Sequence, residues 1–393
     1  IYGFIFTFFS SFGQSFFLGL FNAPIRNELD ISHGQFGSIY AAATICSSLL
    51  LIWVGKKIDE YKLFNYSYFV ISLLFISSIF FSLISSVYLL IIGIFLMRFS
   101  GQGLMNHTSS TAISRYFEKS RGKALSTIWL GLSAAEFILP VLVIYFLTIY
   151  SWQVVWQGIA VLIIISLPLL INSTIKNINF ETREDNLIIR SKLRIKNWKR
   201  IEVIKDYRFY IISLNMLAMP WIFTGIAVYQ SFISESKLWS YYTIPKAFMI
   251  YSVTTILTLF LSGFLVDKFT SRKLVPLMNI PLLLSMIVLF LMDHYYSAFI
   301  FFGLIGISNG LANVLGSSTW AEIYGVKHIG AIKSLTTAFM VFSTAFGTAL
   351  FGLLIDNGVT IENIALIAAI YIVLSLTLFL IFRNSFEPKI LKK

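Results

Sequence analysis

The sequence predicts an all-α membrane protein with twelve transmembrane helices in two six-helix pseudo-repeats. The chain has 393 residues, of which 57% are hydrophobic and only 12% charged. Soluble domains average about 45–50% apolar and 25% charged residues. The apolar residues form runs of about 20, the length of helix that crosses a hydrocarbon core of roughly 30 Å. Short motifs of the first half also recur in the second half.

The apolar runs are continuous, whereas the strands of a membrane barrel alternate apolar and polar residues. We therefore expect helices. The twelve expected spans are 1–23, 34–54, 64–84, 87–113, 124–147, 153–174, 209–232, 246–266, 274–291, 296–320, 330–353 and 361–382.

The basic residues predict the orientation of the chain. If the first helix enters from the cytoplasm, only Arg26, Lys237 and Lys246 of the 30 lysines and arginines fall on the outer side, and Arg98 lies within the membrane. This bias places both termini in the cytoplasm, and it suggests a multi-pass protein of a plasma membrane, specifically a bacterial inner membrane. The net charge of +12 then reflects orientation, and no nucleic-acid partner is expected.

One long polar stretch divides the spans six and six, with ten basic residues between Lys176 and Arg208. The predicted parts are an N-terminal bundle, a cytoplasmic linker and a C-terminal bundle, over residues 1–174, 175–208 and 209–393. Four apolar residues lie three positions apart among the basic residues of the linker: Ile195, Trp198, Ile201 and Ile204. The linker is either simply solvated or contains a short helix that lies on the inner leaflet.

The two halves share short motifs at an offset of about 208 residues. "GKKID" at Gly55–Asp59 matches "GFLVD" at Gly263–Asp267, and "QGLMN" at Gln102–Asn106 matches "NGLAN" at Asn309–Asn313. Each match falls in or after the corresponding helix. Two copies in the same orientation, related by an axis along the membrane normal, are an architecture of secondary transporters.

These motifs carry a family resemblance. "GFLVDKFTSRK", with Gly263, Asp267 and Arg272, resembles the loop signature of the major facilitator superfamily, and "GKKIDEYKLF" keeps its Gly55 and Asp59. The first copy departs from the pattern in the residues that follow the aspartate.

Other stretches extend the resemblance along the chain. "RFSGQG" from Arg98 resembles the fourth-helix signature of the superfamily, and "GLSAAEFILP" resembles its fifth-helix signature, with Glu136 where a small residue is usual. "RYFEKSRGKAL" and "WAEIYGVKHIGAIKSL" look like the cytoplasmic loops of oxalate/formate and monocarboxylate porters. The resemblance implies alternating access, and we expect a monomer.

Arg98 and Glu136 are the charges that the repeat does not reproduce, since they map onto Ile305 or Gly306 and onto Thr344. Both come out near mid-membrane, and we expect them to interact. A lone arginine at the bilayer centre costs about 2.5–3.5 kcal/mol, so Arg98 should face the protein interior. Arg98 could bind a substrate carboxylate while Glu136 carries a proton. Alternatively, they form a plain ion pair, or the arginine bonds carbonyls of the first helix.

Amide side chains on polar stripes of the spans are further candidates for substrate binding, although such stripes can equally be contacts between helices. With Arg98, the expected substrate-binding residues are Gln14, Gln102, Asn106, Asn215, Asn309 and Asn313. His107 is a second candidate for proton coupling beside Glu136, or else a packed histidine that is hydrogen-bonded to a neighbouring helix.

The loop signatures predict gating residues. Asp59 and Asp267 stand at the cytoplasmic ends of the second and eighth helices, where a carboxylate can meet a helix N-terminus or a basic residue such as Arg115. Bonds that form only when the inner gate closes would favour the outward-facing state. The expected gating residues are Gly55, Asp59, Arg115, Gly263, Asp267 and Arg272.

The predicted function is secondary active transport of a small solute, an organic anion such as a monocarboxylate, by proton symport. The alternative is a proton-driven exporter of lipophilic compounds, because 38 Phe, 19 Tyr and 8 Trp residues could line an aromatic pocket. The sequence shows neither a nucleophile paired with a base nor a phosphate-binding loop, so we do not predict an enzyme. Scattered histidines and the single Cys46 predict neither a metal site nor a disulfide, and no cofactor is expected.

Overall fold

The computed structural model describes the following residues of the chain: 1–116, 121–176, 196–325 and 328–388. Within them, the side chains of 114–116, 121–126, Asp59, Asp267, Ser317 and Ala331 lie outside the description.

The described part of the chain contains eleven helices that are long and apolar enough to cross a membrane, together with one bent pair of shorter helical segments. The pair, Tyr2–Gly13 and Ser15–Leu29, bends by 44° and gives a twelfth candidate span when it is counted as one broken span. The predicted fold class is confirmed. The first span, however, is not the continuous helix that its hydropathy indicates.

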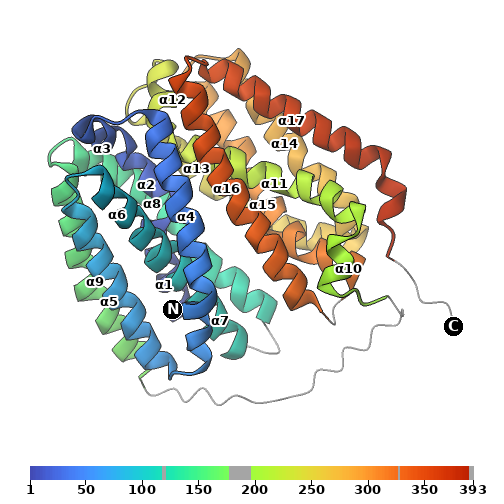
Figure 1. The fold of residues 1–393 in the computed structure, drawn as a ribbon, viewed down its shortest axis with the longest axis horizontal. Coiled ribbons are helices and arrows are strands. Elements are labelled where there is room, and N and C mark those ends of the chain that lie inside the picture. Colours follow the sequence, from blue (N-terminus) through green and yellow to red (C-terminus); the bar gives the residue numbers. More distant parts are fainter. Residues whose placement is uncertain (117–120, 177–195, 326–327, 389–393) are drawn as a thin grey trace. The chain divides into compact units, whose positions relative to one another are not determined.

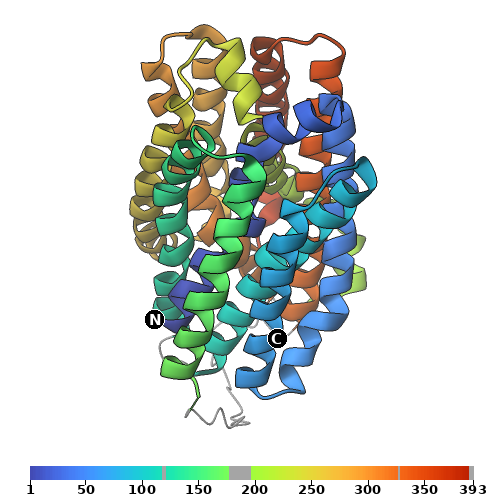
Figure 2. The same cartoon turned by 90° about the vertical axis from the view of Figure 1, so that its left-hand side faces the viewer.

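The chain folds into two compact units. The first comprises Ile1–Arg183, Thr224–Met249 and Thr348–Gly358. Its elements are α1 (Tyr2–Ser10), η1 (Ser11–Gly13), α2 (Ser15–Leu18), η2 (Gly19–Phe21), α3 (Asn22–Leu29), α4 (His33–Lys56), η3 (Lys57–Asp59), α5 (Leu63–Ser82), α6 (Val87–Met97), the π-helical η4 (Arg98–Met105), α7 (Asn106–Tyr116), α8 (Arg121–Leu147), α9 (Trp152–Thr174) and α12 (Gln230–Ser236). In Figures 1 and 2, α5 and α9 run side by side.

The second unit comprises Glu184–Phe223, Ile250–Gly347 and Val359–Lys393. Its elements, three of which reach into the first unit, are α10 (Arg200–Ile204), α11 (Tyr207–Val228), α13 (Thr243–Phe269), α14 (Ser271–Leu291), α15 (Tyr296–Tyr324), α16 (Ile329–Asp356), α17 (Ile361–Ile381) and η5 (Arg383–Phe386). Within this unit α14 packs against α15 and α17.

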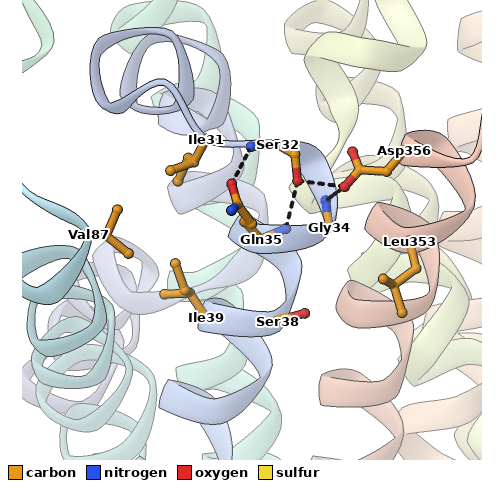
Figure 3. Close-up of a pocket in the computed structure, with 9 residues that line it drawn as sticks. All are labelled: Ile31, Ser32, Gly34, Gln35, Ser38, Ile39, Val87, Leu353 and Asp356. Atoms are coloured by element: carbon orange, nitrogen blue, oxygen red, sulfur yellow. Dashed lines mark hydrogen bonds between the residues drawn. The ribbon is translucent and has the colours of Figure 1, made fainter.

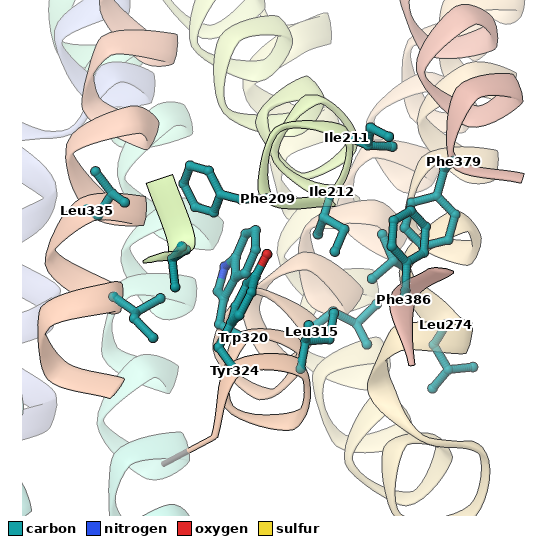
Figure 4. Packing of buried hydrophobic residues seen from close by; sticks show 14 of the residues in the cluster. Phe209, Ile211, Ile212, Leu274, Leu315, Trp320, Tyr324, Leu335, Phe379 and Phe386 are labelled. Carbon is teal, nitrogen blue, oxygen red and sulfur yellow. The ribbon is translucent and has the colours of Figure 1, made fainter. Parts of the chain in front are cut away.

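A cluster of buried hydrophobic residues, aliphatic and aromatic, forms the core of the second unit (Figure 4). The ring of Phe209 on α11 lies 5.3 Å from Trp320 of α15, and the ring of Phe386 lies 4.6 Å from Phe379 of α17. Phe386 belongs to η5, so the segment after the last span packs back onto the core.

The last part of the predicted linker belongs to the same core. Trp198 and Val203 are buried there, and the Trp198 amide donates to the carbonyl of Tyr324 at 3.0 Å. Ile201, on α10, is 65% exposed, and Ile195 lies outside the described residues. The described part of the linker is therefore a short helix that packs on the second unit, and the reading of a simply solvated linker does not hold for it.

Candidate functional site

The first membrane span is broken at Gln14, whose ψ of 154° is extended. The amides of Phe17 and Leu18 donate to the carbonyl of Gln14, at 3.2 and 3.0 Å, so the helix restarts at Ser15, directly after the break. A backbone carbonyl at membrane depth needs another partner. For Gly13 that partner is Arg98, whose Nη1 donates to its carbonyl at 3.1 Å.

Arg98 begins the π-helical segment that separates α6 from α7. π-Helical turns are rare and often lie at functional sites. In the second half, α15 is a continuous α-helix in which Ile305 is fully buried. A Cβ on the neighbouring Gly306 would lie 2.4 Å from the carbonyl oxygen of Tyr251. At the position where two helices pack directly against each other in the second half, the first half therefore has the guanidinium of Arg98.

The guanidinium of Arg98 is buried among neutral groups. Its side chain is 2% exposed, and Nη1 also donates to the hydroxyl of Ser15 at 3.3 Å. Its Cζ lies 5.2 Å from the ring centroid of Tyr40, a cation–π distance, and the Tyr40 hydroxyl donates to Ser15 at 3.0 Å. No ion pair between described residues includes Arg98. Its Nε is buried without a hydrogen-bond partner.

Two glycines allow the first helix to approach the π-helical segment. A Cβ on Gly13 would lie 2.3 Å from the carbonyl oxygen of Met97, and one on Gly101 would lie 2.7 Å from the amide nitrogen of Gly13. Real Cβ atoms essentially never come closer than 3.0 Å to such atoms. The first glycine of "SGQG" is therefore a packing requirement that brings Arg98 to the broken helix.

Glu136 is a second buried ionisable side chain of the same unit. Its side chain is 5% exposed and makes no hydrogen bond or ion pair with a described residue. Its helix, α8, approaches α1 at Gly131, where a Cβ would lie 2.0 Å from the carbonyl oxygen of Phe4. Arg98 and Glu136 thus form no ion pair: the arginine bonds the first helix, which was one of the alternatives, and the carboxyl group pairs with no described residue.

The amides predicted to accompany Arg98 in the first half have unused capacity. Gln14, Gln102 and Asn106 are partly buried, and their side chains make no hydrogen bond with described residues. The Oδ1 atom of Asn106 is buried without a partner. Their place on the segments that carry Arg98 keeps them as candidates.

His107 contacts α4, the second membrane span of the chain. Its Nε2 lies 2.9 Å from the carbonyl oxygen of Gly55 on α4. This bond favours the packed histidine over the proton relay. It also gives Gly55, a predicted gating residue, a definite contact.

The amides predicted in the second half differ from one another. Asn215 is fully buried, and its Nδ2 donates to the carbonyl of Ser375 at 2.8 Å, while Asn279 donates to its Oδ1 at 3.2 Å. These bonds join α11, α14 and α17, so Asn215 is a contact between helices. Asn309 donates to the hydroxyl of Tyr251 at 2.8 Å, and Asn313 is exposed.

Arg272, a predicted gating residue, belongs to a capped helix start in the second unit. Its Nε lies 3.1 Å from Oε1 of Glu322. The other oxygen of Glu322 accepts from the amides of Ser271 and Arg272, at 2.9 and 3.2 Å, at the first turn of α14. A carboxylate at this position stabilises the helix N-terminus. Glu387, after η5, lies 3.8 Å from Arg272 Nη2.

The remaining gating predictions are not tested by these contacts. The side chains of Asp59, Arg115 and Asp267 lie outside the described residues. A Cβ on Gly263 would have no atom within 4 Å, so close packing does not explain this glycine.

Sequence reasoning did not place Ser15 or Tyr40 in the site. Ser15 lies on a polar stripe of the first helix, which was a usable signal. Tyr40 stands in an apolar run of α4, and nothing in its sequence neighbours indicates that its ring lies under Arg98.

Eleven apolar helices with one bent pair, an internal repeat and a buried charge beside a broken helix are features of a secondary transporter, not of an enzyme. The chain belongs to the major facilitator superfamily, whose family model matches residues 3–246 and, in an overlapping second match, residues 210–393.

Solved structures agree on the fold. A bacterial homolog of the human lysosomal transporter Spinster, inward-facing and unoccupied, is similar at a TM-score of 0.71 with 13% identity, over 98% of this chain and 96% of that one. Its inward-facing, occupied form gives 0.69 and 15%, over 98% and 94%. The nucleoside transporter NupG gives 0.70 and 13%, over 97% and 98%. At these identities the likeness shows the fold alone, and the resemblance to oxalate/formate and monocarboxylate porters stays a prediction.

Proposed function

We propose that this secondary transporter moves a small organic anion, with monocarboxylates as the substrate class and Arg98 as the residue that binds the carboxylate. One observation carries the proposal. Arg98 is 2% exposed, its partners among the described residues are all neutral, and its buried Nε has no partner there. A buried cation without a counter-ion is costly, and an anionic substrate supplies the missing charge.

The geometry of the guanidinium favours a carboxylate. Nη1 is engaged by Gly13 and Ser15, and no hydrogen bond joins Nε or Nη2 to a described residue. The Nε and Nη2 hydrogens lie on one edge, and a carboxylate accepts both in a bidentate pair. Gln14, Gln102 and Asn106 complete the proposed site in the first half. Asn309 and Asn313 are, separately, the proposed substrate-binding residues of the second half.

We assign proton coupling to Glu136. Its carboxyl group is buried and pairs with no described residue, a surrounding in which the neutral form is favoured over the charged one. The change Glu136→Gln mimics the protonated form. We expect it to abolish accumulation driven by a pH gradient and to leave substrate exchange intact. Accumulation that still follows the pH gradient would contradict this role.

The charge pattern of the sequence supports the proposed orientation, with both termini in the cytoplasm of a bacterial inner membrane. We further propose a monomer that works by alternating access. The rival function, export of lipophilic compounds, has little support from the aromatic residues of the first unit. Phe17, Phe21 and Phe81 pack around the ring of Trp156 at 4.7–5.6 Å in the buried core.

The test is ligand-induced stabilisation of the purified protein. A ligand that binds only the folded state raises the unfolding temperature by mass action. We expect lactate or acetate to stabilise the wild type and not Arg98→Gln, while the exposed control Arg383→Gln behaves as the wild type. Stabilisation by a nucleoside or a neutral lipophile, with no effect of any carboxylate, would overturn the anion assignment.

A further inference from the structure

The broken first helix also makes contacts at its other end, with the break between α11 and α12. A Cβ on Gly19 would lie 1.9 Å from the carbonyl oxygen of Ala227, so the two backbones touch. Asn22 donates to the carbonyl of Val228 at 2.9 Å. Gln230 donates to the carbonyl of Phe16 at 2.9 Å. These bonds join segments of the two sequence halves within the first unit.

Tyr229, between α11 and α12, closes the same end. Its hydroxyl lies 2.9 Å from the carbonyl oxygen of His33 and 3.0 Å from that of Thr348, and the ring is 1% exposed. Two glycines make room for the hydroxyl, because a Cβ on either Gly37 or Gly352 would lie 2.3 Å from it.

A helix cap adds a further contact at this end (Figure 3). Asp356, the last residue of α16, accepts hydrogen bonds from the hydroxyl of Ser32 at 2.5 Å and from the amide of Gly34 at 2.8 Å. Both donors belong to the first turn of α4, where a carboxylate is favoured. We call the contacts of α2–α4 with residues 227–230 and with Thr348 and Asp356 the distal gate; it is closed in this structure.

The distal gate and the Arg98 site share one short segment. Gly13 and Ser15, which bond Arg98, flank the break at Gln14. Phe16, Gly19 and Asn22, which make gate contacts, follow within two turns. A second link runs through α4, since Tyr40 bonds Ser15 while the start of the same helix bonds Tyr229 and Asp356.

We propose that an anion on Arg98 and the closed distal gate oppose each other through the segment from Gly13 to Asn22. This inference rests on the proposed function for its ligand. In the closed state Arg98 satisfies the Gly13 carbonyl and the Ser15 hydroxyl. A carboxylate on the free Nε–Nη2 edge pairs with this guanidinium through stronger, charge-assisted bonds and draws it away from the neutral partners of Nη1. The freed carbonyl at the break then loses its partner, which loosens the segment that holds the gate.

Thermodynamic linkage makes the proposal measurable in both directions. If the anion favours the open gate, then a substitution that weakens the closed gate must also tighten anion binding. The affinity should rise by the factor by which the substitution increases the population of the open state. Loss of the Gln230 side-chain bonds should shift the gate equilibrium about threefold to tenfold, the usual range for a hydrogen bond.

The first arm of the experiment needs no ligand. Spin labels at Tyr88→Cys and Ser236→Cys, in a Cys46→Ser background, report the gate, because both sites are exposed and lie in the first unit. We expect Ser15→Ala and Arg98→Gln to add a longer-distance population, and the exposed control Arg383→Gln to add none. Distance distributions that stay unchanged in both site variants would overturn the link.

The second arm uses lactate. We expect lactate to lengthen the label distance in the wild type, and Gln230→Leu and Tyr229→Phe to bind it about threefold to tenfold more tightly. The matched controls Gln157→Leu and Tyr150→Phe, at exposed positions, should bind it as the wild type does. A gate that opens in Gln230→Leu with unchanged lactate affinity refutes the coupling. Failure of lactate to bind the wild type, with a positive first arm, refutes the substrate class and leaves the link intact.

Discussion

Replacing Gly13 with alanine tests the packing that places Arg98. The new Cβ would lie 2.3 Å from the carbonyl oxygen of Met97 and 2.5 Å from the amide nitrogen of Gln102. Both are backbone atoms, so no side-chain rotation relieves the contact. Because such contacts essentially never fall below 3.0 Å, the two segments must separate by about 0.7 Å.

Overpacking of this kind costs about 1–3 kcal/mol. Alanine in place of glycine returns about 0.4–1 kcal/mol through the unfolded chain. We therefore expect Gly13→Ala to lower the free energy of unfolding by about 1–2 kcal/mol. The carbonyl that bonds Arg98 also moves, so lactate affinity should change with it.

The matched control is Gly158→Ala on α9, where a Cβ meets no atom within 4 Å. Thermal unfolding in detergent, followed by tryptophan fluorescence, should show Gly13→Ala less stable than the wild type and Gly158→Ala equal or more stable. Equal stability of the two variants, with wild-type lactate affinity in Gly13→Ala, would refute the argument.

Three further predictions concern single charges. Arg98→Lys keeps the charge but loses the planar fork, so lactate affinity in a titration should fall about tenfold or more; an unchanged affinity would exclude bidentate binding. Glu322→Gln removes the carboxylate that caps α14 and should lower the free energy of unfolding by about 1–2 kcal/mol, whereas Glu387→Gln, whose side chain is 77% exposed, should change it little; equal effects would refute the cap. Asp267→Ala should shift the label distances at the gate and slow transport with little change in lactate affinity, and a large loss of affinity at unchanged distances would contradict a gating role.

The fold followed from the sequence because membrane insertion depends on local composition. A run of about 20 apolar residues spans a bilayer wherever it occurs, and Lys and Arg fix the orientation of a loop without reference to the rest of the fold. The buried position of Arg98 was predictable for the same reason, since a charge in such a run must avoid lipid.

The partners of that charge were not predictable. A hydropathy average does not reveal the break at Gln14, because it depends on residue type and is the same whether the backbone is extended or helical. Without the break, the Gly13 carbonyl would be bonded within its own helix and Arg98 would need another partner. The interaction expected between Arg98 and Glu136 rested on depth alone, and depth does not determine the direction of a side chain.

The sequence by itself predicted an all-α membrane protein built as a duplicated bundle, with one unmatched guanidinium in its interior. Only the tertiary structure decided what that guanidinium bonds, that its helix is locally π-helical, and that Tyr229 and Asp356 close the distal gate. Insertion is settled residue by residue in the chain, whereas a hydrogen bond across the bundle depends on where two distant backbones come to rest.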